Sequence, residues 1–124
     1  MKIYSTRRKY YKWDLARFVG KDVWVRCSQY NTENGTWVQD LYVNIVDEPN
    51  YYGNTTDFYS IRCIPAWQMS AGAILEVSDI DSYISRLLNH PIIIRKSSID
   101  LQYIHGVDMY STDEVVAKLR EAAA

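Results

Sequence analysis

The sequence has few of the residues that build metal or redox sites. Its 124 residues include two cysteines, Cys27 and Cys63, and two histidines, His90 and His105. The cysteines form no Cys-x-x-Cys pair, and neither histidine has a partner at the spacing of zinc ligands. The sequence therefore predicts no metal and no cofactor, and both cysteines are expected to be reduced, buried and inert.

Long apolar runs and known catalytic motifs are missing too. No stretch approaches the roughly 20 apolar residues of a membrane-spanning helix. The chain also turns basic at 7–9, where a signal peptide would turn apolar. It has no glycine-rich phosphate loop and no Gly-x-Ser-x-Gly motif. These absences predict a cytoplasmic protein with no membrane partner and no enzymatic activity. If the chain comes from a phage, the predicted location is the host cytoplasm or the virion.

Two enzymatic interpretations have weaker support. Cys27 or Cys63 with His105 would make a small hydrolase, but no motif surrounds these residues. Acidic pairs occur at 79–81 and 113–114, in the first turns of predicted helices. Acids there stabilise the helix dipole, so capping explains both pairs without catalysis.

Aromatic residues are abundant and unevenly chosen. The chain has 11 tyrosines and 4 tryptophans against only 2 phenylalanines. Tyrosine and tryptophan combine an apolar body with a polar tip, which suits strands, half-buried surfaces and partner interfaces. The composition therefore indicates a tyrosine-rich β-structure, and it favours an exposed contact surface.

The pattern predicts one α+β domain over residues 1–124, with a small, mostly antiparallel sheet and three short helices. The sheet is a candidate for an SH3-like or OB-like barrel. In the strand predicted at 22–30 the odd-numbered apolar residues from Val23 to Cys27 lie on one face and Trp24 on the other. In the return strand at 37–46 the odd-numbered apolar residues from Leu41 to Ile45 face one way and Tyr42 the other. Strands are predicted at 2–5, 22–30, 37–46, 58–64, 74–77, 91–95 and 99–105, and helices at 9–19, 78–89 and from 111 onward.

Particular residues set the expected boundaries. An Asn-Gly turn within 31–36 predicts a hairpin. Ser78 is the expected N-cap of the second helix, while Ser111 and Glu114 form a capping box for the last. The isoleucine run at 91–95 predicts a buried strand.

The N-terminal segment is the main candidate binding site. Residues 1–26 hold eight basic and two acidic side chains, whereas the rest of the chain holds six and thirteen. Basic and aromatic residues interleave there, and a helix over 9–19 would place Trp13 opposite an apolar stripe through Leu15 and Phe18. Tyr51 and Tyr52, with Trp67, form a second predicted patch. The predicted partner-binding residues are Arg7, Arg8, Lys9, Lys12, Trp13, Arg17, Tyr51 and Tyr52.

Two functional hypotheses follow. The first is a non-enzymatic protein that binds an acidic surface of a protein partner and forms homo-oligomers. The alternative is a small β-barrel that binds nucleic acid through the basic, aromatic N-terminal segment. A sequence pI near 6.1 favours the protein partner, because dedicated nucleic-acid binders are basic overall. In size and texture the chain resembles small stand-alone proteins of phages and mobile elements, which implies an inhibitor of a host system or a small virion component.

Overall fold

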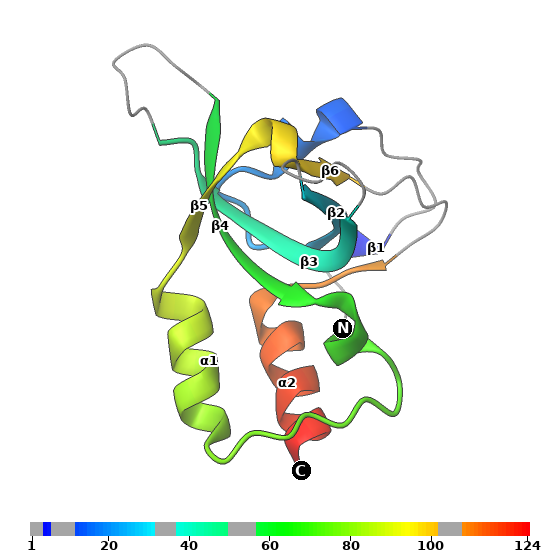
Figure 1. Cartoon of the computed structure of the whole chain (residues 1–124). Helices are drawn as coiled ribbons and strands as arrows, with labels where there is room; N and C mark the ends of the chain where they lie inside the picture. Colours follow the sequence, from blue (N-terminus) through cyan, green and yellow to red (C-terminus); the bar gives the residue numbers. More distant parts are fainter. Residues whose placement is uncertain (1–3, 6–11, 32–36, 50–56, 102–107) are drawn as a thin grey trace.

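The computed structural model describes residues 4–5, 12–31, 37–49, 57–101 and 108–124 (Figure 1). These residues form an α+β structure with a five-stranded antiparallel sheet in the order β5-β4-β3-β2-β6. A second sheet pairs β1 with β7. The strands are β1 (Tyr4–Ser5), β2 (Val25–Asn31), β3 (Trp37–Asp47), β4 (Phe58–Pro65), β5 (Ile92–Arg95), β6 (Ile99–Leu101) and β7 (Asp108–Met109).

Two α-helices are found in the described residues, α1 (Ile80–Asn89) and α2 (Thr112–Ala123). They lie on the same side of the sheet (Figure 1). Three 3-10 helices complete the structure: η1 (Lys12–Phe18), η2 (Ala66–Met69) and η3 (Lys96–Ser98). The segment predicted as the first helix is thus the 3-10 helix η1 in its described part, and a count of three α-helices is not confirmed.

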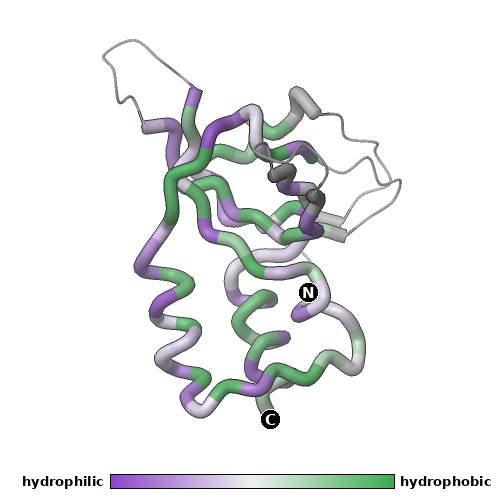
Figure 2. The backbone as a smooth tube through the Cα atoms, in the orientation of Figure 1, coloured by the Kyte–Doolittle hydropathy of each residue, from purple (hydrophilic) through white to green (hydrophobic). Residues whose placement is uncertain are grey.

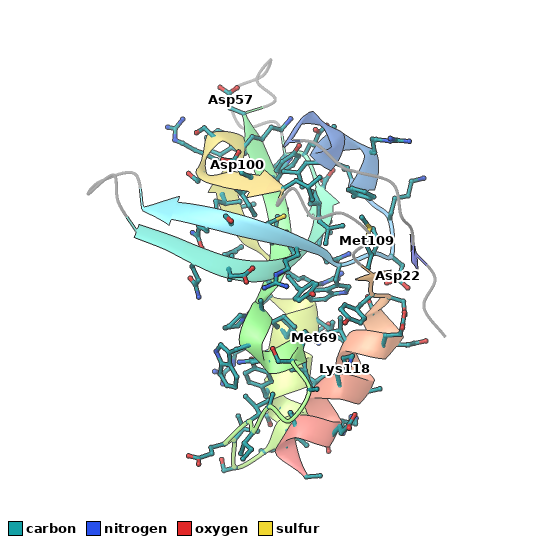
Figure 3. The ribbon with its side chains drawn as sticks, turned by 90° about the vertical axis from the view of Figure 1, so that its right-hand side faces the viewer. Asp22, Asp57, Met69, Asp100, Met109 and Lys118 are labelled. Carbon is teal, nitrogen blue, oxygen red and sulfur yellow. The ribbon has the colours of Figure 1, made fainter. Side chains whose placement is uncertain are left out.

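Side-chain alternation in β2 and β3 builds a core on each face of the sheet. Val25 and Val43 are buried in one core with Leu15 and Phe18 of η1. The predicted assignment of residues to the two faces is therefore confirmed. Figure 3 shows Met109 at the level of the sheet and Met69 at the level of the helices. The second core contains Trp24, Tyr42, Ile64, Ala66, Met69, Leu75, Ile84, Val115 and Leu119.

The sheet is strongly curled. Its two edge strands, β5 and β6, are consecutive in the chain and are joined only by η3. Four residue steps from Arg95 to Ile99 span at most about 14 Å, whereas a flat five-stranded sheet would separate its edges by about 19 Å. Curling brings the two edges toward each other, but the sheet is not closed, so a barrel is not confirmed.

The strand predicted at 91–95 is confirmed as β5, but the prediction that it is buried is wrong. In the described residues β5 pairs only with β4 and forms one edge of the sheet. Its Ile92 and Ile93 side chains are 50% and 42% exposed. Figure 2 shows β5 as a hydrophobic stretch at the rim of the molecule. A continuous apolar run can indicate burial on both faces, but here only Ile94 packs partly against the core.

The helix boundaries follow the capping residues closely. The N-cap of α1 is Asp79, whose carboxylate accepts a hydrogen bond from the Ser82 amide, so the prediction of Ser78 was one residue too early. The predicted capping box of Ser111 and Glu114 is confirmed at α2. The strand predicted at 74–77 is wrong, because this segment pairs with no strand among the described residues; the Leu75 amide donates to the Ala122 carbonyl of α2 instead.

Candidate functional site: a groove beside an open strand edge

Half of strand β4 has a strand neighbour on one side only. On one side β3 pairs with β4 as far as Pro65. On the other side β5 pairs with β4 only from Phe58 to Ile61. The edge from Arg62 to Pro65 therefore lacks a strand partner in the described residues. The cause is local, since the chain leaves α1 and passes through Pro91, which cannot donate a backbone hydrogen bond, before it starts β5.

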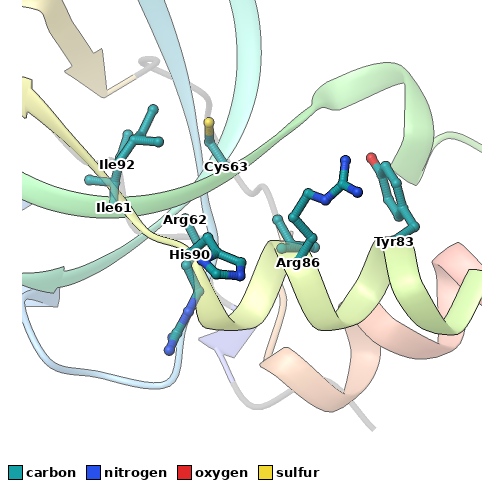
Figure 4. A pocket seen from close by; sticks show the side chains of 8 residues that line it. Ile61, Arg62, Cys63, Tyr83, Arg86, His90 and Ile92 are labelled. Atoms are coloured by element: carbon teal, nitrogen blue, oxygen red, sulfur yellow. The ribbon is translucent and has the colours of Figure 1, made fainter.

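A groove lies between this open edge and helix α1, with a cavity volume of about 250 Å³ (Figure 4). Strand β4 forms one side, α1 forms the other, and the first residue of β5 closes one end. The groove is lined by Ile61, Arg62, Cys63, Tyr83, Arg86, Leu87, His90 and Ile92.

The lining combines apolar side chains with basic ones. Leu87 and Ile92 supply apolar surface, while Arg86 and His90 are exposed at the rim. No carboxylate is among the described residues that line the groove. The site therefore suits a ligand with apolar groups and a negative charge.

Arg62 holds helix α1 against the sheet. Its Nε donates to the Leu88 carbonyl at 2.9 Å, and its Nη1 donates to Oδ1 of Asn44 at 2.9 Å. Asn44 is buried and donates from Nδ2 to the carbonyls of Lys21 and Val23. This network satisfies one of the last carbonyls of α1 and fixes the width of the groove at its β5 end.

The opposite end of the groove is fixed by Tyr83. The Tyr83 hydroxyl donates to Oε1 of the buried Gln68 at 2.7 Å, which connects α1 to η2. Both ends of α1 are thus tied to the sheet region. We infer that the groove is largely preformed, which lowers the entropy cost of binding.

Cys63 lies on the groove but is poorly suited to nucleophilic chemistry. The side chain is half-buried, which corrects the expectation that both cysteines are buried. Burial raises the pKa of the Cys63 thiol and raises that of the buried Cys27 further. Both groups are therefore thiols at neutral pH, not thiolates. His105, the base in the hydrolase hypothesis, lies outside the described residues.

We expect the two thiols to react with a disulfide reagent such as DTNB at different rates. In the folded protein Cys63 should react slowly and Cys27 only after unfolding, because a thiolate with access to solvent is needed. Cys63→Ser should remove the slow phase and leave the folded protein intact. Rapid labelling of two thiols per chain in native buffer would contradict this prediction.

A second hollow, of about 480 Å³, surrounds Trp67. The Trp67 side chain is 52% exposed. Beside it, Nε of Arg26 donates to both carboxylate oxygens of Asp40 at 3.0 and 3.1 Å. An ion pair already satisfies these two charges, so we rank this hollow below the groove. Tyr51 and Tyr52, predicted to join Trp67 in one patch, lie outside the described residues.

The predicted N-terminal site is only partly covered by the structure. Leu15 and Phe18 are buried and Arg17 is exposed, in agreement with the predicted apolar stripe. The backbone of η1 includes Lys12 and Trp13, whose side chains are not described. Arg7, Arg8 and Lys9 lie outside the described residues. The structure thus leaves the predicted contact face of Lys9, Trp13 and Arg17 untested.

The sequence did not indicate Arg86 or Leu87 as site residues. The helix predicted at 78–89 places His90 just after its end, and this is confirmed, since His90 is the C-cap of α1. One available signal was Pro91 at the start of the isoleucine run, because proline next to a strand favours an edge position.

The described residues form no metal-ligand cluster and no membrane-spanning helix, and the chain has no significant match to known proteins. In the described part of the chain, no three histidine, cysteine or acidic side chains are grouped as metal ligands would be. No described helix is long and apolar enough to cross a membrane. Comparisons with protein-family models, curated proteins and solved structures found no significant match.

Proposed function

We propose that the chain is a non-enzymatic binding protein that recognises a protein partner through the groove between β4 and α1. The open edge of β4 within a groove of apolar and basic residues is the observation that carries this proposal. Ile92, which lines the groove, and its neighbour Ile93 are both exposed large apolar side chains. The roles that we propose for such a binder are inhibition of a host system or a structural role in a virion.

A random library of displayed 12-residue peptides tests this proposal. Clones selected on the wild-type protein should bind Ile92→Lys at least tenfold more weakly, because Ile92 closes the groove. Ile74→Lys is the matched control, since Ile74 is 74% exposed and does not line the groove. The proposal fails if no clone is enriched, or if every enriched clone binds Ile92→Lys as well as the wild type.

The N-terminal segment is proposed as a second contact surface, in addition to the groove. Arg7, Arg8, Lys9, Lys12, Trp13 and Arg17, with Tyr51 and Tyr52, are its proposed contact residues. Their basic and aromatic character also supports the alternative function, which is single-stranded nucleic-acid binding. A steep loss of affinity with salt would favour nucleic acid, and a shallow loss would favour protein.

Replacement of Trp13 by alanine distinguishes an interface residue from a core residue. If Trp13 anchors a partner, Trp13→Ala should change the free energy of unfolding by under about 0.5 kcal/mol. Binding should weaken by about 2 kcal/mol or more. A melting curve and a titration with those library peptides whose binding does not depend on Ile92 measure the two effects. A loss of roughly 3–5 kcal/mol in stability would place Trp13 in the core instead.

We also propose that the chain forms homo-oligomers through the exposed edge of β5. Edge strands with exposed apolar side chains favour association between copies. Light scattering of the wild-type protein should show a species larger than 14.5 kDa. Ile93→Lys should shift it toward the monomer. A wild-type protein that is monomeric at high concentration would contradict this proposal.

The finer architecture that we propose is a partly open barrel of the SH3-like kind. Four strands, β2 to β5, follow one another in the sheet, and η3 carries the chain across to β6, which pairs with β2. This order supports the SH3-like alternative over the OB-like one.

A further inference from the structure

We infer that the groove binds an extended, acidic peptide segment of the partner, which adds to the sheet as a short strand beside β4. This inference rests on the proposed function and specifies its partner chemistry. It combines three observations: the open strand edge, the apolar side chains of the lining and the absence of carboxylates from the described residues that line the groove.

The open edge is the reason to infer a strand. Edge residues present backbone N–H and C=O groups that another strand can pair with. A peptide in line with β5 would pair with Arg62–Pro65, the part of β4 that lies beyond the last β5 partner, Ile92. Four residues at about 3.3 Å each give an edge of about 13 Å. A helix in the same groove would leave these backbone groups of β4 unpaired, which is unfavourable if they lose water.

The edge is also short, which limits the interaction. Pro65 has no N–H to donate, so the pairing ends there. Three or four paired residues cannot give high affinity by backbone hydrogen bonds alone. Side-chain contacts in the groove must therefore supply both affinity and selectivity.

The charges of the lining favour a carboxylate on the peptide. Arg86 lies midway along the helical wall and His90 lies at the β5 end (Figure 4). Arg62 is already bonded to Leu88 and Asn44, so Arg86 is the guanidinium best placed to meet an incoming acidic group. Leu87 and Ile92 provide the apolar contact for the alternate residues of the peptide.

A capped six-residue peptide of alternating valine and aspartate is the probe. We expect NMR titration to shift the amides of Arg62, Cys63 and Ile64 and to saturate. Arg86→Glu should weaken binding at least tenfold, while Lys21→Glu, with the same charge change at another exposed position, should leave it within twofold. A valine–lysine peptide should bind Arg86→Glu better than it binds the wild type. Equal binding of the aspartate peptide to both charge variants would overturn the inference.

Backbone methylation tests the strand itself. In a paired peptide strand, only every second amide faces the β4 edge. N-methylation of the amides that face β4 should therefore abolish binding, whereas N-methylation of the other amides should be tolerated. Equal effects of the two sets would overturn strand addition. The inference would also be overturned if a twelve-nucleotide oligothymidylate bound in an Arg86-dependent manner and more tightly than the peptide.

The two proposals fail in different ways. If library peptides bind in an Ile92-dependent manner but the valine–aspartate peptide does not bind, the groove is a protein interface without strand addition. If neither binds, the proposed function itself is wrong.

Discussion

Trp24→Ala should lower the free energy of unfolding by about 3–5 kcal/mol. Trp24 is 0% exposed and belongs to the core between sheet and helices. Its Nε1 donates to Oγ1 of Thr112 at 3.0 Å, and its backbone pairs with Tyr110. The substitution therefore removes a large apolar side chain together with a bond to the first turn of α2.

Urea denaturation measures this effect, and Trp67→Ala is the matched control. Trp67 is half exposed, so the same replacement there should cost less than about 1 kcal/mol. Two variants with equal midpoints would show that Trp24 does not support the core as described.

Asn44→Ala should cost about 2–4 kcal/mol, because it leaves buried polar groups without partners. The Asn44 side chain accepts from Arg62 and donates to two backbone carbonyls. The substitution also removes the Asn44 acceptor that holds the Arg62 side chain, whose other hydrogen bond, to the Leu88 carbonyl, connects α1 to the sheet. The variant should therefore bind groove peptides more weakly, even at temperatures where it remains folded.

Chemical denaturation and a peptide titration of the same samples test both expectations. The control is Asn89→Ala, because Asn89 is exposed and its side-chain amide donates to Oγ of Ser85 within α1. Its stability should change by about 0.5 kcal/mol or less. If Asn44→Ala behaves like Asn89→Ala, the buried network is not a significant source of stability.

Features that depend on local patterns could be predicted from the sequence. Alternation identified the two faces of β2 and β3, and the capping box located the start of α2. The Asn-Gly hairpin is consistent with the pairing of Asn31 with Trp37 at the end of the β2–β3 ladder. Each of these signals involves residues only a few positions apart.

The candidate site could not be predicted in this way. It exists because β5 pairs with β4 only as far as Ile61, while β3 continues to Pro65. Pro91 marks where β5 can begin, but the register of β5 against β4 is fixed by the whole sheet, so no local pattern shows which residues of β4 are left open. The same limit explains the error at β5, since an isoleucine run does not reveal whether a second strand lies beside it.

The position of β6 has a consequence for how the protein folds. Strand β2 pairs with β3 after a short connection, but its other partner, β6, follows only after β4, α1 and β5. Joining such distant segments early would cost much chain entropy, since the loop between them would still be disordered. Once β2 to β5 have formed a curled meander, η3 delivers β6 next to β2 at little further cost. The slowest kinetic step is therefore expected to precede β6 pairing, so substitutions in β6 should accelerate unfolding more than they slow folding.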